Sequence, residues 1–378
     1  MKKSFALLIL LLVAMAPVFA QKMYKGLPVI EAKSDKGDYR IGKEWKRGNW
    51  TIMPEISPDV VNVAVHKNKV NVAFHTDSDS IVFDVKPGRS YPFYIHLGGE
   101  NYALTEFKGY SFEALKFDQT KRAPAHTILY EQNVNNQFLN TLREKYNLDA
   151  IVKGAANDTE KAFRMVNWVH KQWNHNGSNT PTKPDALTIL AEVKDGKQFR
   201  CVEYGIVTTA CLNAIGLPAR VMGLKMKDVE TIHSGAGHVL LEVYLTDLKK
   251  WVLLDGQYDV MPVLNNVPLN AVEFQQAIAK NYDKLEIRSM SGTNKADYVN
   301  WIYPYLYYFD VKFDNREGVD FTRQTVDSKK SLMLVPVGAK EPKIFQVTNP
   351  ITYCKYTTSV ADLYAAPDMT PAATKAQR

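Results

Sequence analysis

Cysteine is scarce in this sequence: 378 residues contain only Cys201, Cys211 and Cys354. An odd number leaves at least one thiol without a disulfide partner. If Cys201 and Cys211 lie on one helix, ten residues at about 1.5 Å each place them roughly 15 Å apart. A disulfide requires Cα atoms within about 7 Å of each other, so these two cannot pair. At least one free thiol therefore needs another explanation.

Long apolar runs are also scarce, and the only one lies at the N-terminus. FALLILLLVAMAPVF follows Lys2 and Lys3 and leads into Ala20. A basic start, an apolar middle and small residues at the end predict a secretory signal peptide over residues 1–20. A retained membrane anchor is the alternative interpretation. No later segment is long and apolar enough to cross a bilayer. We therefore expect an exported protein, periplasmic or secreted, without stable membrane insertion after signal cleavage.

Concentrated charge of one sign is absent as well. The sequence has 47 basic and 40 acidic residues, and without Lys2 and Lys3 the balance is 45 against 40, a net charge of +5. The excess is spread along the chain, with no basic stripe carrying interleaved aromatic residues. Nucleic acid is therefore not an expected partner.

Motifs for nucleotides and metals are missing too. There is no GxGxxG, no P-loop, no HExxH and no CxxC. His170 and His175 are five residues apart, about 140° around a helix, so they do not share a face for zinc. The sequence predicts no cofactor and no metal.

What is present divides into regions of different periodicity. Alternating apolar and polar residues predict a β-rich N-terminal domain over residues 21–130. Helical spacing followed by strands predicts a mixed core over 131–287, and a second β-rich region, which includes YVNWIYPYLYYFDV, follows over 288–366. Residues 367–378 resemble a disordered tail. Helices first and an antiparallel hairpin sheet afterwards give an α+β fold class.

Within the core, the spacing predicts several helices and strands. The second helix has an apolar stripe that includes Trp173. Asp158 is its predicted N-cap, and Gly177 is predicted to end it. Trp168 and Trp173 are interpreted as core residues rather than as a substrate platform. The predicted helices cover residues 136–148, 158–177, 185–193, 201–215 and 272–286, and the predicted strands cover 219–226, 238–246 and 250–255.

Cys201 is the first candidate for chemistry because it begins a predicted helix. The positive end of the helix dipole and free backbone N–H groups favour a thiolate there. Val202, Ile206, Ala210 (or Thr209) and Ile215 are predicted to mark the buried side of this helix. Residues 198–200 offer no good N-cap side chain, which leaves first-turn N–H groups available for an oxyanion. The alternative is that Cys201 is an ordinary buried thiol.

His238 and Asp255 are the second candidate, because they belong to one predicted hairpin. If the turn is centred on residues 247–248, His238 lies opposite Gln257. Asp255 is then a diagonal neighbour on the same face, about 7 Å away. A carboxylate at this position can bind one imidazole nitrogen and leave the other for a thiol. A register slip of one residue would place Asp255 on the opposite face.

Other residues compete for these roles. Asp259 is the alternative acid if the register differs. His233, in a Ser-Gly-Ala-Gly loop, is either a substrate contact or a solvated loop residue, and it is the alternative base. Cys211, ten residues into the helix, is predicted to pack in the core, and Cys354 has no assigned role.

Three blocks of this sequence resemble the transglutaminase-like superfamily: CVEYGIVTTACLNAIGLPARVMG, HVLLEVYL and WVLLD. The resemblance covers roughly residues 150–260 and implies a papain-like core with β-rich flanks. It also implies that Cys201 is the nucleophile, His238 the base and then the acid, and Asp255 the group that orients the histidine. The family often has an aromatic residue soon after the histidine, where this sequence has Val239.

The resemblance implies acyl transfer on an amide of a peptide, a protein or a peptidoglycan-like substrate. Hydrolysis, as by a protease or amidase, is preferred because it is the reaction of the superfamily's bacterial members. A protein-crosslinking transglutaminase is one alternative. A binding module with a vestigial triad is the other.

Overall fold

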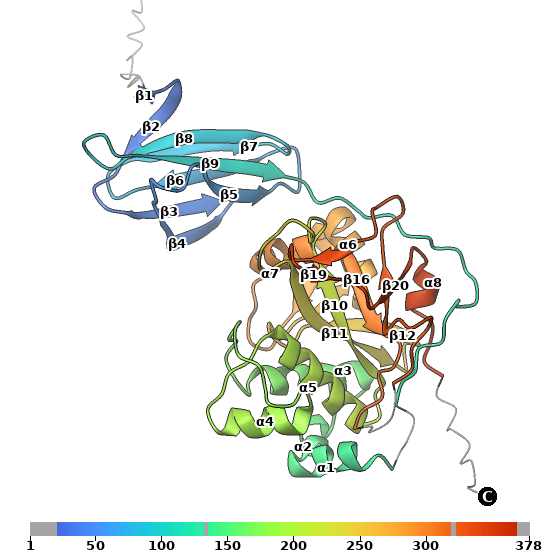
Figure 1. Ribbon diagram of the computed structural model, residues 1–378. Helices are drawn as coiled ribbons and strands as arrows, with labels where there is room; N and C mark the ends of the chain where they lie inside the picture. Colours follow the sequence, from blue (N-terminus) through green and yellow to red (C-terminus); the bar gives the residue numbers. More distant parts are fainter. Residues whose placement is uncertain (1–20, 132–134, 319–322, 369–378) are drawn as a thin grey trace, which may run out of the picture. The chain divides into compact units, whose positions relative to one another are not determined.

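The computed structural model describes residues 21–131, 135–318 and 323–368 (Figure 1). The predicted signal peptide and the tail residues 369–378 lie outside the described residues. The chain forms two compact units, one ending at Ser111 and the other beginning at Phe112. Within the described ranges, no helix combines the length and apolar character needed to span a membrane.

The first unit is a β-sandwich of two sheets. Phe74 comes from one sheet, and Phe93 and Phe107 come from the other; the Phe74 and Phe93 ring centroids are 5.5 Å apart. All three rings are fully buried, so the two sheets are held together by an aromatic core. The strands run in the orders β1-β2-β8-β9-β5 and β4-β3-β6-β7, with bounds β1 Met23–Tyr24, β2 Leu27–Glu31, β3 Lys36–Ile41, β4 Glu44–Thr51, β5 Asp59–Ala64, β6 Val70–His75, β7 Ser80–Val85, β8 Ser90–His96 and β9 Tyr102–Tyr110.

The boundary of this unit differs from the predicted position near residue 130. Strand β9 ends at Tyr110, and the segment after it packs on the second unit. Phe117 is buried in that unit's core. The N–H of Asp118 donates to the carbonyl of Thr358 (2.8 Å), and that of Leu129 donates to Phe313 (2.8 Å). An extended segment without a sheet of its own is thus held by backbone pairing to the second unit.

The second unit is built on one sheet that joins the predicted core and the predicted C-terminal region. Its six strands run in the order β12-β11-β10-β16-β17-β20, and only the β17–β20 pair is parallel. The bounds are β10 Ala219–Lys225, β11 Gly237–Leu245, β12 Lys250–Leu254, β16 Tyr308–Lys312, β17 Ser331–Leu334 and β20 Cys354–Thr357. Smaller sheets pair β13 Met261–Leu264 with β14 Val267–Pro268 and β15 Leu285–Arg288, and β18 Ile344–Phe345 with β19 Asn349–Pro350.

Helices cover both faces of this sheet (Figure 1). Successive residues of β11 point to opposite faces of the sheet. Leu241 packs with the helices that precede the sheet in the sequence, and Leu240 packs with the helices that follow β12 in the sequence. The first group is α1 Gln137–Lys145, α2 Leu148–Val152, α3 Asp158–His170, α4 Ala186–Lys194 and α5 Cys201–Ala214; the second is α6 Ala271–Lys280 and α7 Lys295–Ile302, and α8 Val360–Leu363 closes the fold. The α+β fold class is as predicted.

The predicted caps of the second helix were wrong. Asn157, not Asp158, is the N-cap of α3, and its side chain accepts from the N–H of Glu160. The helix ends at His170, seven residues before Gly177. Both asparagine and aspartate accept at this position, and the chain entered the helix one residue earlier than the apolar stripe indicated.

The predicted β character of residues 298–311 was also wrong over its first part. Residues 295–302 form α7, capped by Asn294, whose side chain accepts from the N–H of Asp297. Tyr298, Val299 and Ile302 are buried on one side of this helix. Aromatic and β-branched residues favour strands only weakly, and packing against the sheet overrides that preference.

A fully buried ion pair lies on the α6 side of the sheet. The Arg220 guanidinium donates to Glu242 Oε2 (Nη2 at 2.6 Å), and neither side chain is exposed to solvent. Arg220 also donates to the hydroxyl of Tyr130 (3.0 Å) and to the carbonyl of Leu363 (2.7 Å). Glu242 Oε1 accepts from the N–H of Ala271 (3.0 Å) at the start of α6. This pair therefore joins the sheet, α6 and two distant segments.

Candidate active site

Cys201 is the first residue of α5, the helix at the centre of its layer. The N-cap is Arg200, whose guanidinium has no lone pair to accept from the first-turn N–H groups. Instead, Glu203 accepts from the N–H and the side chain of Arg200 (3.1 and 2.7 Å). Cys201 is partly exposed. A thiol at this helix end faces the positive end of the dipole, as the sequence predicted.

The predicted buried side of α5 was right only in part. Residues 203–205 and 207–214 are buried, among them Thr209 and Ala210, whereas Val202, Ile206 and Ile215 are only partly buried. Val202 and Ile206 line a pocket, and Ile206 also packs against the core. Because α5 is surrounded by the sheet and other helices, most of its circumference is apolar, and periodicity could not reveal which side was exposed.

Gly205 sets the distance between α5 and strand β11. A Cβ atom at this position would lie 3.1 Å from Val239 Cγ1 and 3.2 Å from the carbonyl oxygen of Leu240. The absence of a side chain therefore lets the helix lie against the strand that carries His238.

The hairpin has the predicted register. Leu241 pairs with Leu254 and Leu245 with Lys250, so the turn is centred on residues 247–248. His238 and Asp255 consequently lie on one face, and His238 Nε2 is 2.9 Å from Asp255 Oδ2. Both side chains are buried. With Nε2 bound to the carboxylate, Nδ1 is the nitrogen left for the Cys201 thiol.

Asp255 is held in place by groups besides His238. Its Oδ2 accepts from the hydroxyl of Tyr298 (2.9 Å), and its Oδ1 accepts from the N–H groups of Gln257 (3.0 Å) and Tyr258 (3.4 Å). Tyr298 lies on α7, far along the chain. Tyr298 was not among the predicted site residues because residues 298–311 were predicted as strand.

The pKa of His238 is raised to about 9. Burial acts in the opposite direction, but the charge and hydrogen bond of Asp255 outweigh it, and a hydrogen bond with the Cys201 side chain adds to the increase. His238 is therefore a cation near neutral pH, held between a carboxylate and a thiol. That arrangement is the one a thiolate–imidazolium pair requires.

This shift predicts a pH dependence of stability. A histidine whose pKa is raised in the folded state stabilises the fold fully below its unfolded pKa of about 6.5. That contribution is lost as the pH rises through about 9. We expect the unfolding free energy of the wild type, measured with urea relative to His238→Gln, to fall between these pH values. A difference that stays constant would mean that His238 is folded in its neutral form.

Aromatic residues from the C-terminal part of the chain surround His238. The Trp301 ring meets it edge to face, with centroids 4.8 Å apart, and the Tyr305 centroid is 6.1 Å away. Tyr258 packs on Trp301 (4.4 Å). These rings limit the access of water to the His238–Asp255 pair. The aromatic residue missing after His238 in the sequence thus has counterparts from elsewhere in the chain.

His175 also lies near the site. Its pKa is lowered by burial and by the positive charge of His238. His175 was considered from the sequence only as a zinc ligand. His170 is occupied otherwise, since its Nδ1 lies 3.0 Å from the carbonyl oxygen of Gln257.

Asp259, the alternative acid, and His233, the alternative base, bind other groups. Asp259 is buried, and its Oδ2 accepts from Asn167 (2.8 Å) and from the hydroxyl of Ser291 (2.8 Å). His233 is exposed, and its carbonyl accepts from Gln346 (3.1 Å). Among these candidates, His238 and Asp255 are the base and acid that contact each other.

The other thiols are buried. Cys211 packs in the core formed by α1–α5, and Cys354 begins β20 in a smaller cluster. Burial raises the pKa of both thiols, which keeps them protonated and unreactive. Trp173 is likewise core: it is buried, stacked on Tyr204 with centroids 4.2 Å apart.

This contrast predicts different responses to truncation. Cys211→Ala should lower the melting temperature by several degrees because it leaves a cavity of about one sulfur atom in a packed core. Cys201→Ala should change it little because that side chain is partly exposed. Thermal melts of the two variants side by side test the assignment. If Cys201→Ala is the less stable of the two, Cys201 is a structural thiol.

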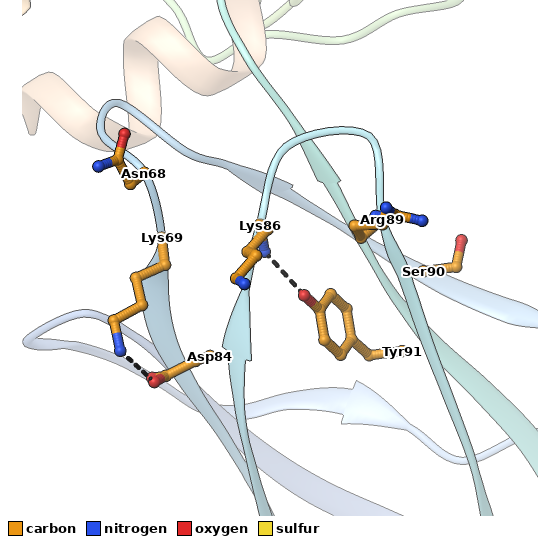
Figure 2. Close-up of a pocket in the computed structure, with 7 residues that line it drawn as sticks. All are labelled: Asn68, Lys69, Asp84, Lys86, Arg89, Ser90 and Tyr91. Atoms are coloured by element: carbon orange, nitrogen blue, oxygen red, sulfur yellow. Dashed lines mark hydrogen bonds and ion pairs between the residues drawn. The ribbon is translucent and has the colours of Figure 1, made fainter.

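A separate hollow of about 760 Å³ lies in the N-terminal unit (Figure 2). Lys69 pairs with Asp84 there (2.6 Å), and the N–H of Lys86 donates to the hydroxyl of Tyr91 (3.0 Å). Its lining residues include neither a cysteine nor a histidine.

One family model matches part of this chain. Residues 147–256 match the model of the transglutaminase-like superfamily, a range that contains Cys201, His238 and Asp255. No protein of curated function matches the sequence.

Solved structures show more distant likenesses. A candidate cysteine protease from Cytophaga hutchinsonii is 16% identical over 40% of this chain and 50% of its own, with a TM-score of 0.27. A candidate protease from Parabacteroides distasonis is 12% identical over 58% and 41%, with a TM-score of 0.23. Red sea bream transglutaminase is 10% identical over 57% and 44%, with a TM-score of 0.25. The chain spans half or less of each of these proteins.

Proposed function

We propose that this protein is an exported cysteine-dependent acyl-transfer enzyme. Residues 147–256 match the transglutaminase-like superfamily. Within this range Asp255 binds His238, and Cys201 begins the neighbouring helix α5. The enzyme's substrate is an amide of a peptide, a protein or peptidoglycan-like material, and hydrolysis is the preferred outcome. The observation that carries the proposal is the 2.9 Å contact between His238 Nε2 and Asp255 Oδ2, which leaves Nδ1 for the thiol.

The first half of the reaction forms a thioester. The Cys201 thiolate attacks the amide carbonyl carbon, and the oxyanion is stabilised by N–H groups of the first turn of α5. The imidazolium of His238 gives its proton to the leaving nitrogen as the carbon–nitrogen bond breaks. Asp255 keeps its charge and holds the ring in position throughout.

The second half releases the acyl group. Neutral His238 takes a proton from water, the resulting hydroxide attacks the thioester, and the carbon–sulfur bond breaks. Cys201 leaves as thiolate and the product is a carboxylic acid. An amine in place of water would give a new amide, the outcome of a crosslinking transglutaminase.

The proposal is tested by incubating wild type and Cys201→Ala with peptides and cell-wall fragments, with and without a fluorescent alkyl amine. Mass spectrometry then distinguishes an acid product from an amide product. We expect acid products that require Cys201. Amine incorporation instead would favour the crosslinking reaction. Products from neither reaction, together with an unreactive Cys201, would leave a binding module with a vestigial triad.

A further inference from the structure

A pocket of about 670 Å³ lies between α5 and the sheet, and its lining starts next to the proposed nucleophile. Val202 and Ile206 of α5 and Val239 of β11 supply apolar lining. Val202 follows Cys201 in the chain, so the pocket starts one residue from the thiol. Val239 follows His238 but points to the other face of β11, toward α5, so the pocket adjoins the site at its Cys201 side.

The pocket also has cationic lining. Lys312, Arg323 and Lys330 supply it, from β16 and from the segment that leads to β17. All three residues keep solvent-exposed surface, but the Lys312 ammonium group itself lies in surroundings that desolvate it. Within the described residues, neither Lys312 nor Lys330 forms an ion pair with an acid.

The acids of the pocket are already occupied. Asp310 forms an ion pair with Lys225. Asp314 binds Arg316 (2.6 Å) and lies 3.8 Å from Arg323. Lys225 and Arg316 offset the charges of the two carboxylates. The three cationic side chains that line the pocket therefore give it an excess of positive charge.

The cations also repel one another. The pKa of Lys312 is lowered, first by burial and then by the charge of Arg323. Glu317 is the remaining acid near both groups, but burial raises its pKa to about 7, so it is partly neutral at neutral pH. An added carboxylate in the pocket would relieve this repulsion.

We propose that this pocket selects acyl donors that carry a carboxylate next to an apolar segment, such as peptides with an acidic side chain near the scissile amide. The apolar part lies on Val202, Ile206 and Val239, and the carboxylate meets Lys312, Arg323 and Lys330. This inference rests on the proposed function and adds its substrate preference. Charge complementarity beside an apolar surface supports this assignment.

The test uses pairs of peptidyl chloromethyl ketones that are identical except for Glu in place of Gln at one position. Rates of Cys201 labelling are followed by mass spectrometry in the wild type, in Lys312→Gln/Lys330→Gln, and in Lys280→Gln. The last variant removes an exposed lysine at the end of α6, outside the pocket.

We expect the acidic probe to label the wild type and Lys280→Gln faster than the neutral probe at one or more positions. The preference should fall by up to about fivefold for each pocket lysine removed, while labelling by the neutral probe is unchanged. Equal rates for acidic and neutral probes at every position, or a preference that survives in the double variant, overturn the pocket assignment. If no probe labels Cys201, the proposed function itself fails.

Discussion

Replacing Asp255 with asparagine is expected to lower turnover on the order of 10⁴-fold and to leave the protein folded. The carboxylate binds His238 Nε2 and stabilises the imidazolium. An amide of the same size has no charge for that task and can present an N–H to the ring, which favours the wrong tautomer. The measurement is kcat/KM on a peptide that the wild type hydrolyses.

Tyr298→Phe is the graded control for this experiment. It removes one of the hydrogen bonds to Asp255 and keeps the carboxylate. If the lost hydrogen bond raises the activation free energy by about 1.4 kcal/mol, the rate falls tenfold. Tyr298 is a positioning residue, so its variant should shift the pH profile of activity as well as the rate. If Asp255→Asn keeps more than about a tenth of wild-type activity, Asp255 does not orient the base.

Removing the Glu242 side chain is expected to be the most destabilising change outside the site. Glu242→Ala leaves the Arg220 guanidinium buried without its counter-charge, which costs about 3–5 kcal/mol. It also removes the acceptor for the N–H of Ala271 at the start of α6. Urea unfolding monitored by circular dichroism measures the difference.

The double variant Arg220→Met/Glu242→Leu is the matched control. Replacing both charges by apolar groups leaves no unpaired ion, so it should be more stable than Glu242→Ala alone. A cost below about 1 kcal/mol for Glu242→Ala would show that water reaches Arg220 and that the pair does not tie the sheet to α6.

Local signals predicted the parts of the site that lie close together in the sequence. The hairpin turn and the alternation of β11 and β12 placed His238 and Asp255 on one face, and the structure has that register. The predicted helix over residues 201–215 begins at Cys201, as α5 does in the structure.

The parts that could not be predicted depend on packing between distant segments. Tyr298 and Trp301 reach the site only because 295–302 folds as a helix against the sheet. The exposed side of α5 was misjudged because a central helix is apolar almost all round. Neither feature has a signature within a single window of sequence.

The most direct test of the central claim is the rate at which iodoacetamide alkylates Cys201 at about pH 6, followed residue by residue with mass spectrometry. The account predicts that Cys201 reacts faster than free cysteine in the same buffer, and that Cys211 and Cys354 stay unmodified while the protein is folded. It also predicts that His238→Gln removes the advantage of Cys201. A Cys201 that reacts no faster than free cysteine, or equally fast without His238, would contradict the proposed thiolate–imidazolium pair.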